Sequence, residues 1–343
     1  MIENNQFFMP GEWEKHERTL MEWPVKESMV WPDNYEEFCE GFLSVAKAIS
    51  EFEPVTIIVN PGERVKVQSL CGALAEILEI PHNDAWCRDN GPTILVNKKG
   101  ERLGINWRFN AWGEKYKPYD LDDKVAKEVL RHLQIPAKDV LLVLEGGSIH
   151  ADGEGTLLTT KQCLLNTNRN PALTQEKIEE ILKEVLKVNK IIWLEKGLDG
   201  DETDGHIDNI ACFARPGVVL IQTCYDKKDP NYDITMENLD ILRHTRDAWG
   251  RKLTVIEIPQ PPARFYKNNR LTLSYLNFYM VNRGIILPVF KEEGADTDLK
   301  AERILSRVFP DRKIVTVDGM ALIKEGGNVH CITQQIPAGI AVD

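Results

Sequence analysis

The sequence predicts an α/β fold, organised as a five-fold pseudosymmetric propeller of ββαβ-like modules around a central site. One supporting observation is that helix, strand, polar loop and strand recur along the chain. A second is that polar loop residues recur at intervals of 56, 61, 64 and 61 residues, at Asp89, Glu145, His206, Arg270 and Cys331. A nearly constant period of this size is typical of repeat architectures, which favours a closed ring.

A repeated fragment supports the same architecture. The six residues from Glu145 to His150 read Glu-Gly-Gly-Ser-Ile-His, and those from Glu325 to His330 read Glu-Gly-Gly-Asn-Val-His. The alternative is an ordinary doubly wound sheet, in which strands also alternate with helices. Because the chain contains no long linker and no low-complexity tract, we expect residues 1–343 to form one domain.

Each element is predicted from a local pattern. Apolar residues at helical spacing predict a helix over Tyr35–Glu53, and the apolar run Val55–Val59 predicts a buried strand. Asp120 is expected to act as the N-cap of a later helix. Further helices are predicted over residues 63–78, 121–133, 174–188, 234–249 and 298–309. Further strands are predicted over residues 93–96, 140–144, 157–160, 191–194, 253–258, 271–279 and 314–317.

Composition limits the classes of partner. The formal charge of -11, with 42 basic and 53 acidic residues, argues against nucleic acids and anionic membranes. The seven cysteines are scattered and form no Cys-x-x-Cys pair, so a disulfide framework is not expected. The first residues lack the features of a signal peptide, and no apolar run is long enough to span a bilayer. We therefore expect a cytoplasmic protein.

The most informative stretch lies near the C-terminus. Gly326 and Gly327 allow a tight turn, and Val329–Ile332 is predicted to be a short extended segment. Cys331 would then follow a turn, where its thiol can face a cavity. The alternative interpretation is that Cys331 is a small buried apolar residue, as many free cysteines are.

Several predicted loops are rich in carboxylates. His206 and Asp208 are two residues apart, so they would face the same side of an extended strand. Asp89 lies close to Trp86, and Glu145 ends an apolar run. A pocket that contains several carboxylates selects a cation, and paired carboxylates suit the planar guanidinium group in particular.

The same residues also allow simpler structural roles. A lone His-x-Asp pair is more often a structural hydrogen-bonded pair. The acidic loop that begins at Asp199 could bind calcium, but Thr203 and Asp204 occupy positions that do not fit an EF-hand. A zinc site would require closer spacing than His206 and Cys331 have in the sequence.

The chain resembles the agmatine deiminase family, within the larger pentein-type group of guanidine-modifying enzymes. The resemblance covers nearly the whole chain, although Asp204 stands where the family usually has Asn, and Ile336 where it has Gln or Glu. The motifs that carry it are Met9–Trp13, Met21–Pro24, Trp86–Thr93, Phe109–Gly113, Leu144–Gly147, Glu202–Asn209, Ser274–Tyr279 and Gly326–Gln335.

The resemblance implies a five-bladed α/β propeller and a set of residue roles. Cys331 would be the nucleophile that forms an S-amidino (thiouronium) intermediate. His206 would be the general acid and then the general base, oriented by Glu145. Asp89 and Asp208 would hold the guanidinium group. Trp86 and Glu202 would contact the aliphatic tail and the distal ammonium group of the substrate.

The implied reaction hydrolyses agmatine to N-carbamoylputrescine and ammonia in putrescine biosynthesis, without a metal or an organic cofactor. The alternatives are a deiminase of free or peptidyl arginine, an amidinotransferase, and a catalytically silent cation-binding protein. A deiminase of free arginine would need a cation for the α-carboxylate, which Arg264 or Arg270 could supply. The expected partner is a small cationic guanidine compound, and a homo-oligomer is compatible with the sequence.

Overall fold

The computed structural model describes residues 6–339. Its strands form five sheets with a shared plan and one separate two-stranded hairpin. Four of the sheets have three strands each: β4 (Thr93–Val96), β5 (Arg102–Arg108) and β6 (Ala137–Val143); β7 (Ile149–Ala151), β8 (Thr156–Thr160) and β9 (Lys190–Leu194); β10 (Ala211–Arg215), β11 (Val218–Thr223) and β12 (Thr254–Pro259); β15 (Tyr279–Val281), β16 (Gly284–Val289) and β17 (Lys313–Asp318).

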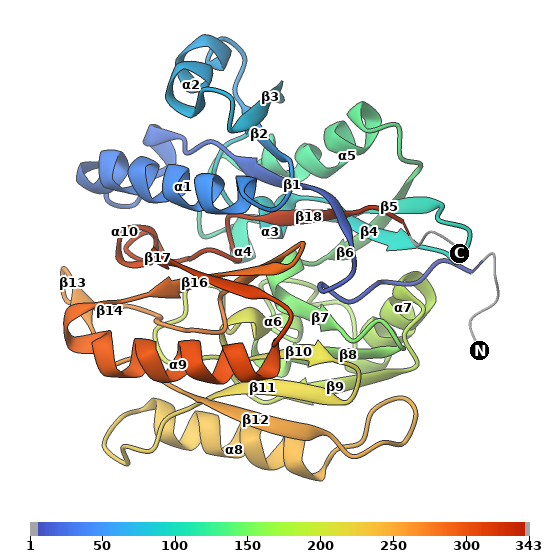
Figure 1. The fold of residues 1–343 in the computed structure, drawn as a ribbon. Coiled ribbons are helices and arrows are strands. Elements are labelled where there is room, and N and C mark those ends of the chain that lie inside the picture. Colours follow the sequence, from blue (N-terminus) through green and yellow to red (C-terminus); the bar gives the residue numbers. More distant parts are fainter. Residues whose placement is uncertain (1–5, 340–343) are drawn as a thin grey trace.

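In each of these sheets the first two strands pair antiparallel and the last two pair parallel. The fifth sheet repeats this plan with strands from opposite ends of the sequence. In it, β18 (Gln334–Pro337) pairs antiparallel with β1 (His16–Glu22), which pairs parallel with β2 (Val55–Val59). A further strand, β3 (Ala75–Glu79), extends this sheet. Figure 1 shows β1 and β18 side by side.

A parallel strand pair needs a crossover connection, and a helix supplies it in every module. Figure 1 shows α8 and α9 lying along the outer side of their own strands. The crossover helices are α1 (Tyr35–Ser50), α5 (Asp122–His132), α7 (Gln175–Leu186), α8 (Asn231–His244) and α9 (Ala295–Val308). Short helices are α2 (Arg64–Cys71), α3 (Cys87–Asn90), α4 (Ala111–Glu114), α6 (Lys161–Leu164) and α10 (Met320–Ile323), and the hairpin is β13 (Phe265–Tyr266) and β14 (Asn269–Arg270).

The apolar faces of these elements form the core. In α1, Phe38, Phe42, Val45 and Ile49 are fully buried and recur at helical spacing. Strand β2 is buried at every position, and Thr56 is the one polar residue in its otherwise apolar sequence. The α/β class is thus confirmed, and within residues 6–339 no helix is long and apolar enough to cross a membrane.

Two predicted element boundaries are wrong. The helix expected over residues 63–78 ends at Cys71, because Gly72 takes a positive φ of 59° that reverses the chain before β3. Asp120 does not cap α5. The side chain of Asn83, from a distant loop, accepts hydrogen bonds from the backbone N–H groups of Leu121 and Asp122 instead.

Two predicted extended segments are also wrong. Most of the segment over residues 271–279 is irregular, and β15 begins only at Tyr279. Val329–Ile332 lies in turns, and β18 begins at Gln334. The two irregular segments meet, because the backbone N–H of His330 donates to the carbonyl oxygen of Asn277 over 3.1 Å. They thus satisfy each other's buried polar groups in place of a β-ladder.

Candidate active site

A pocket with about 530 Å³ of empty space, part of it open solvent, brings together loops from widely separated parts of the chain. Cys331 and Asp89 line its wall, whereas His206 and Asp208 lie directly behind them. The lining residues are Ser28, Met29, Val30, Asp84, Trp86, Asp89, Trp112, Tyr116, Glu202, Thr203, Glu325, Gly326, Gly327 and Cys331. Aromatic rings and carboxylates therefore dominate the walls of this cavity.

Cys331 lies in the turn between α10 and β18, where its side chain is 6% exposed. Its sulfur is 3.3 Å from Nδ2 of Asn277 and 3.6 Å from Oδ2 of Asp208. Burial raises the pKa of the Cys331 thiol well above its ordinary value, and the charges of Asp208 and Asp89 raise it further. Both effects favour the protonated form of this thiol in the free protein.

His206 immediately precedes a short 3₁₀ turn, η4 (Ile207–Asn209), so the expected extended strand through His206 and Asp208 is wrong. Its Nδ1 lies 3.7 Å from Oδ1 of Asp89. Burial lowers the pKa of His206, but Asp89, Cys163 and Asp208 outweigh that effect and raise it well above the ordinary value. Both ring nitrogens are buried without a hydrogen-bond partner among the described residues, and are free to exchange protons with a ligand.

Asp89 lies in the one-turn helix α3 and is fixed from two sides. The indole N–H of Trp112 donates to its Oδ2 over 2.9 Å, and the backbone N–H of Gly147 donates to its Oδ1 over 2.9 Å. Burial raises the pKa of this carboxyl. The charge of His206 lowers this pKa and the charge of Asp208 raises it, and the net pKa is above the ordinary value. A positively charged ligand would favour its ionised form.

Asp208 is held by His330, whose Nδ1 lies 3.0 Å from its Oδ2. Burial raises the pKa of Asp208, but the hydrogen bond and charge of His330, with the charge of His206, bring it below its ordinary value. Its other oxygen, Oδ1, is buried and has no protein partner within residues 6–339. That oxygen is available to accept a hydrogen bond from a bound cation.

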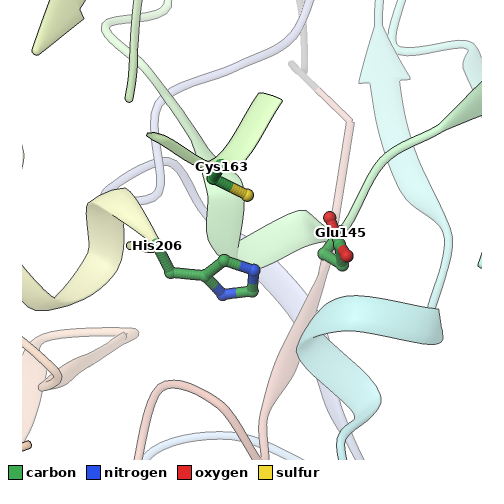
Figure 2. A group of neighbouring side chains, drawn as sticks. All are labelled: Glu145, Cys163 and His206. Atoms are coloured by element: carbon green, nitrogen blue, oxygen red, sulfur yellow. The ribbon is translucent and has the colours of Figure 1, made fainter. Parts of the chain in front are cut away.

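Glu145 is fully buried and accepts a 2.6 Å hydrogen bond from Nε of Arg169. The closest ligand-type atoms of Glu145, Cys163 and His206 lie within 4.8 Å of one another, and Figure 2 shows these side chains converging from separate segments. These three residues could in principle hold a metal ion. However, the guanidinium of Arg169 already neutralises Glu145, which disfavours a second cation at the same carboxylate.

The outer part of the cavity carries three further carboxylates. Glu202 is exposed and accepts a 2.6 Å hydrogen bond from the hydroxyl of Tyr116. Glu325 accepts a 3.0 Å hydrogen bond from Asn34, and burial raises its pKa. Burial also raises the pKa of Asp84 to about 7. This part of the cavity therefore favours a second positive charge on the ligand.

Trp86 forms an aromatic wall of the cavity together with Trp112. Gly327 packs against that wall so closely that a Cβ atom there would lie 2.3 Å from the Trp86 ring. Gly327 is thus required for the close approach of the Cys331 turn to Trp86, whose ring stands at 82° to that of Trp112.

The structure brings together all seven residues proposed from the sequence as site residues, but several neighbours were not predicted. Asn277 contacts the sulfur of Cys331, Trp112 fixes Asp89 and Arg169 pairs with Glu145. Asn277 and Trp112 lie inside motifs that carry the family resemblance, so those motifs could have indicated that these two residues belong to the site. Arg169 lies in none of the motifs, and only its three-dimensional neighbours reveal its place.

Comparison with known proteins identifies the family. The sequence model of the family described as Porphyromonas-type peptidyl-arginine deiminase matches residues 8–337. The chain belongs to this family. Among the curated relatives, the agmatine deiminase of Pseudomonas aeruginosa strain LESB58 is 44% identical over 358 residues, covering 97% of this chain and 96% of the relative.

Solved structures of this deiminase family share the fold. The agmatine deiminase of Enterococcus faecalis superposes with a TM-score of 0.90 at 36% identity, covering 96% of both chains. A cysteine-to-serine variant of the agmatine deiminase of C. jejuni, solved with substrate bound, superposes with a TM-score of 0.90 at 31% identity, covering 97% of both chains. The predicted membership of the agmatine deiminase family is therefore confirmed.

Proposed function

We propose that this protein is an agmatine deiminase, a hydrolase that converts agmatine and water to N-carbamoylputrescine and ammonia and thereby supplies putrescine synthesis. The observation that carries the proposal is the arrangement of a thiol, an imidazole and two carboxylates at one end of an acidic cavity. The chemistry is hydrolysis of a C–N bond in a linear amidine. The name agmatine deiminase is also that of the relatives at 44% and 36% identity.

In the proposed reaction, the Cys331 thiolate attacks the guanidinium carbon and forms a C–S bond. His206 donates a proton to one nitrogen, the C–N bond breaks and ammonia leaves, which gives a thiouronium intermediate. His206 then accepts a proton from water as that water attacks the same carbon. The C–S bond then breaks and restores the thiolate. The proton left on the new oxygen passes to the released ammonia, so that the ureido product and ammonium depart.

Asp89 and Asp208 would hold the guanidinium nitrogens and fix the carbon against the sulfur of Cys331. Oδ2 of Asp208 lies 3.6 Å from the sulfur of Cys331, and its Oδ1 has no protein partner among the described residues. Glu145, which lies beside His206 and Cys163, would help to orient the imidazole, while Asp89 and Asp208 favour its protonated form. Trp86 would contact the methylene chain and Glu202 the distal ammonium group.

The lining of the cavity favours agmatine over arginine. Among its described lining residues there is no Lys or Arg, whereas Asp84, Glu202 and Glu325 are acidic. Arg264 and Arg270, which could bind the α-carboxylate of arginine, interact with other groups outside this cavity. Arg270 pairs with Asp229 at 2.8 Å, and Arg264 donates to the carbonyl oxygen of Phe290 over 3.0 Å. Agmatine carries an ammonium group where arginine adds a carboxylate, so its charge suits this cavity better.

We also propose that the five modules close into a five-fold pseudosymmetric propeller within one domain. The shared strand order of the five sheets supports it. So does the repeated Glu-Gly-Gly fragment, because its two histidines, His150 and His330, both approach Glu12. For location, we propose the cytoplasm, since the seven cysteines are unpaired in the described part of the chain. Homo-oligomerisation stays a prediction.

The deciding experiment measures ammonia and ureido product released from agmatine, free arginine and a blocked arginine peptide, with Cys331→Ala in parallel. We expect turnover of agmatine, little turnover of the other two substrates, and loss of all turnover in Cys331→Ala. Activity confined to arginine or to the peptide would refute the substrate assignment. Undiminished activity in Cys331→Ala would refute the mechanism.

A further inference from the structure

A row of buried charged side chains runs from Asp208 to a second hollow in the molecule. Nδ1 of His330 lies 3.0 Å from Oδ2 of Asp208, and Nε2 of His330 lies 3.0 Å from Oε1 of Glu12. None of the three residues is more than 6% exposed. Glu12 lines a cavity of about 460 Å³, which shares no lining residue with the active-site cavity.

The two contacts of His330 define its protonation state. A neutral imidazole has one N–H donor, whereas an imidazolium has two. Both nitrogens of His330 face carboxylate oxygens, so only the imidazolium satisfies both contacts. The groups that face this ring are Asp208, Glu12 and the guanidinium of Arg88, which lies 3.5 Å from Oε1 of Glu12. Burial and Arg88 lower the pKa of His330, but the two carboxylates raise it above its ordinary value overall.

Glu12 has no evident task other than to balance these charges. It is buried among His330, Arg88 and His150, whose Nε2 lies 3.6 Å from Oε2. Burial raises the pKa of Glu12, but these three neighbours bring it well below its ordinary value. An ionised Glu12 stabilises the imidazolium of His330 from the side opposite the active site.

The consequence for Asp208 is both electrostatic and geometric. Oδ2 is occupied by His330, while Oδ1 faces no protein donor among the described residues. A carboxylate in so buried a place would tend to take up a proton if no cation were beside it. A protonated Asp208 would grip a guanidinium group weakly, because it would lose the charge-assisted hydrogen bond.

We propose that His330, held by Glu12, is a positioning residue that keeps Asp208 ionised and turns its free oxygen toward the guanidinium group. The inference rests on the proposed function, because it assigns Asp208 to that group. Glu12 and His330 do not touch the substrate in this scheme. They act from the face of the molecule opposite the cavity that admits it.

The kinetic test compares His330→Gln and Glu12→Gln with the wild type. In His330→Gln we expect KM for agmatine to rise about 10- to 100-fold, the size of a lost charge-assisted hydrogen bond, with a smaller fall in kcat. Without the His330 cation the pKa of Asp208 rises, although the charges of His206 and Arg88 still lower it, so the acidic limb of the kcat/KM profile should move to higher pH. Glu12→Gln should change KM and the position of the acidic limb in the same direction, but by a smaller amount.

Glu14→Gln is the matched control, because Glu14 lines the same second cavity but is exposed to solvent. We expect wild-type kinetics from it. The double variant Glu12→Gln/His330→Gln should be little worse than His330→Gln alone, since both act through one residue. The proposal is overturned if the acidic limb stays in place in a folded His330→Gln, or if Glu12→Gln behaves as Glu14→Gln does.

A spectroscopic measurement tests the protonation of His330 independently of catalysis. In ¹⁵N-labelled free protein, the His330 ring, assigned by its loss in His330→Gln or its shift in Glu12→Gln, should carry protons on both nitrogens at pH 8. A neutral ring at that pH would overturn the inference even if agmatine is the substrate. The opposite result is also informative. If the His330 ring is doubly protonated but the protein does not hydrolyse agmatine, the proposed function is wrong, whereas the pairing of His330 with Asp208 and Glu12 is supported.

Discussion

The sulfur of Cys331 lies in an unusual place for a nucleophile. Reactive cysteines generally have neighbouring cations or a helix N-terminus that lower the thiol pKa. Here burial, Asp208 and Asp89 all raise it. The cation that would favour the thiolate must therefore arrive with the substrate, helped by the protonated His206.

The first prediction concerns this thiol. In free protein at neutral pH we expect the ultraviolet absorbance of the thiolate to be absent for Cys331, and to appear when a guanidinium ligand binds. The Cys331→Ser variant supplies the background from the other six cysteines. Equal thiolate absorbance with and without ligand would rule out activation by the substrate.

The second prediction concerns the outer carboxylates. Replacing Glu202 or Glu325 by Gln removes one negative charge from the part of the cavity proposed to face the ammonium group. Since partly exposed ion pairs contribute about 0.2–1 kcal/mol, KM for agmatine should rise about 2- to 5-fold in each variant, with kcat nearly unchanged. The exposed Glu237 on α8 provides the control, Glu237→Gln, which should leave KM alone. A larger fall in kcat than rise in KM would contradict the assignment.

At the scale of elements, the short 3₁₀ turn η3 (Gly146–Ser148) is the tightest point of the site. A Cβ atom on Gly147 would lie 2.7 Å from Nδ1 of His206, 2.8 Å from Oδ1 of Asp89 and 2.9 Å from Oδ2 of Asp208. Gly147 is therefore the position where three functional side chains and one backbone meet.

The third prediction is that Gly147→Ala lowers kcat/KM at least about 100-fold, because a displacement of about 1 Å at reacting groups has this effect. The control is Gly294→Ala, at a glycine with negative φ and a nearest contact of 3.3 Å, outside the active-site cavity. Both variants should be compared by thermal unfolding as well as by kinetics. Near-wild-type turnover in Gly147→Ala would show that the site is looser than its geometry indicates.

Elements with a regular apolar pattern were predictable from the sequence, and those shaped by distant partners were not. β2 and β4 have the predicted bounds because their apolar runs are short and end at turn residues. By contrast, the start of α5 depends on Asn83, and the irregular segment before β15 depends on the Cys331 turn. Local patterns cannot contain such long-range hydrogen bonds.

At the scale of the whole molecule, buried carboxyls couple stability to pH. Burial raises the pKa of Asp122 to about 8, although the backbone N–H of Asn83 opposes this, and raises the pKa of Asp84 to about 7. In the unfolded chain both groups titrate near 4. At these two groups the folded state therefore retains protons that the unfolded state releases, and their contribution to the free energy of unfolding falls as the pH rises from about 4 toward 8.

The fourth prediction is that Asp122→Asn flattens this pH dependence. A carboxyl that is protonated in the folded state and ionised in the unfolded state changes the free energy of unfolding by about 1.4 kcal/mol per pH unit. Between pH 5 and 7, the pH dependence of the variant should therefore be less steep than that of the wild type by up to this amount. Urea unfolding at a series of pH values measures it. The exposed Asp120→Asn serves as control. An unchanged slope in Asp122→Asn would mean that Asp122 is ionised in the folded protein.

The periodic spacing of loop residues located the candidate site before any coordinates, because loops that recur in a repeated module return to the same side of it. Four of the five spaced residues, Asp89, Glu145, His206 and Cys331, lie at or beside the cavity. The fifth, Arg270, pairs with Asp229 at 2.8 Å and is not among the lining residues. Spacing could not indicate that Glu145 bonds to Arg169, or that His330 links Asp208 to Glu12, since these contacts join side chains from different modules.

The pairing of β18 with β1 has a consequence for biosynthesis. Gln334 and Gln335 pair with Leu20 and Thr19, so the last strand of the described residues completes a sheet that begins with the first strand. We therefore expect that, during synthesis, the edge of β1 stays unpaired and the Cys331 turn stays unplaced until β18 has left the ribosome, so that the guanidine site is assembled late.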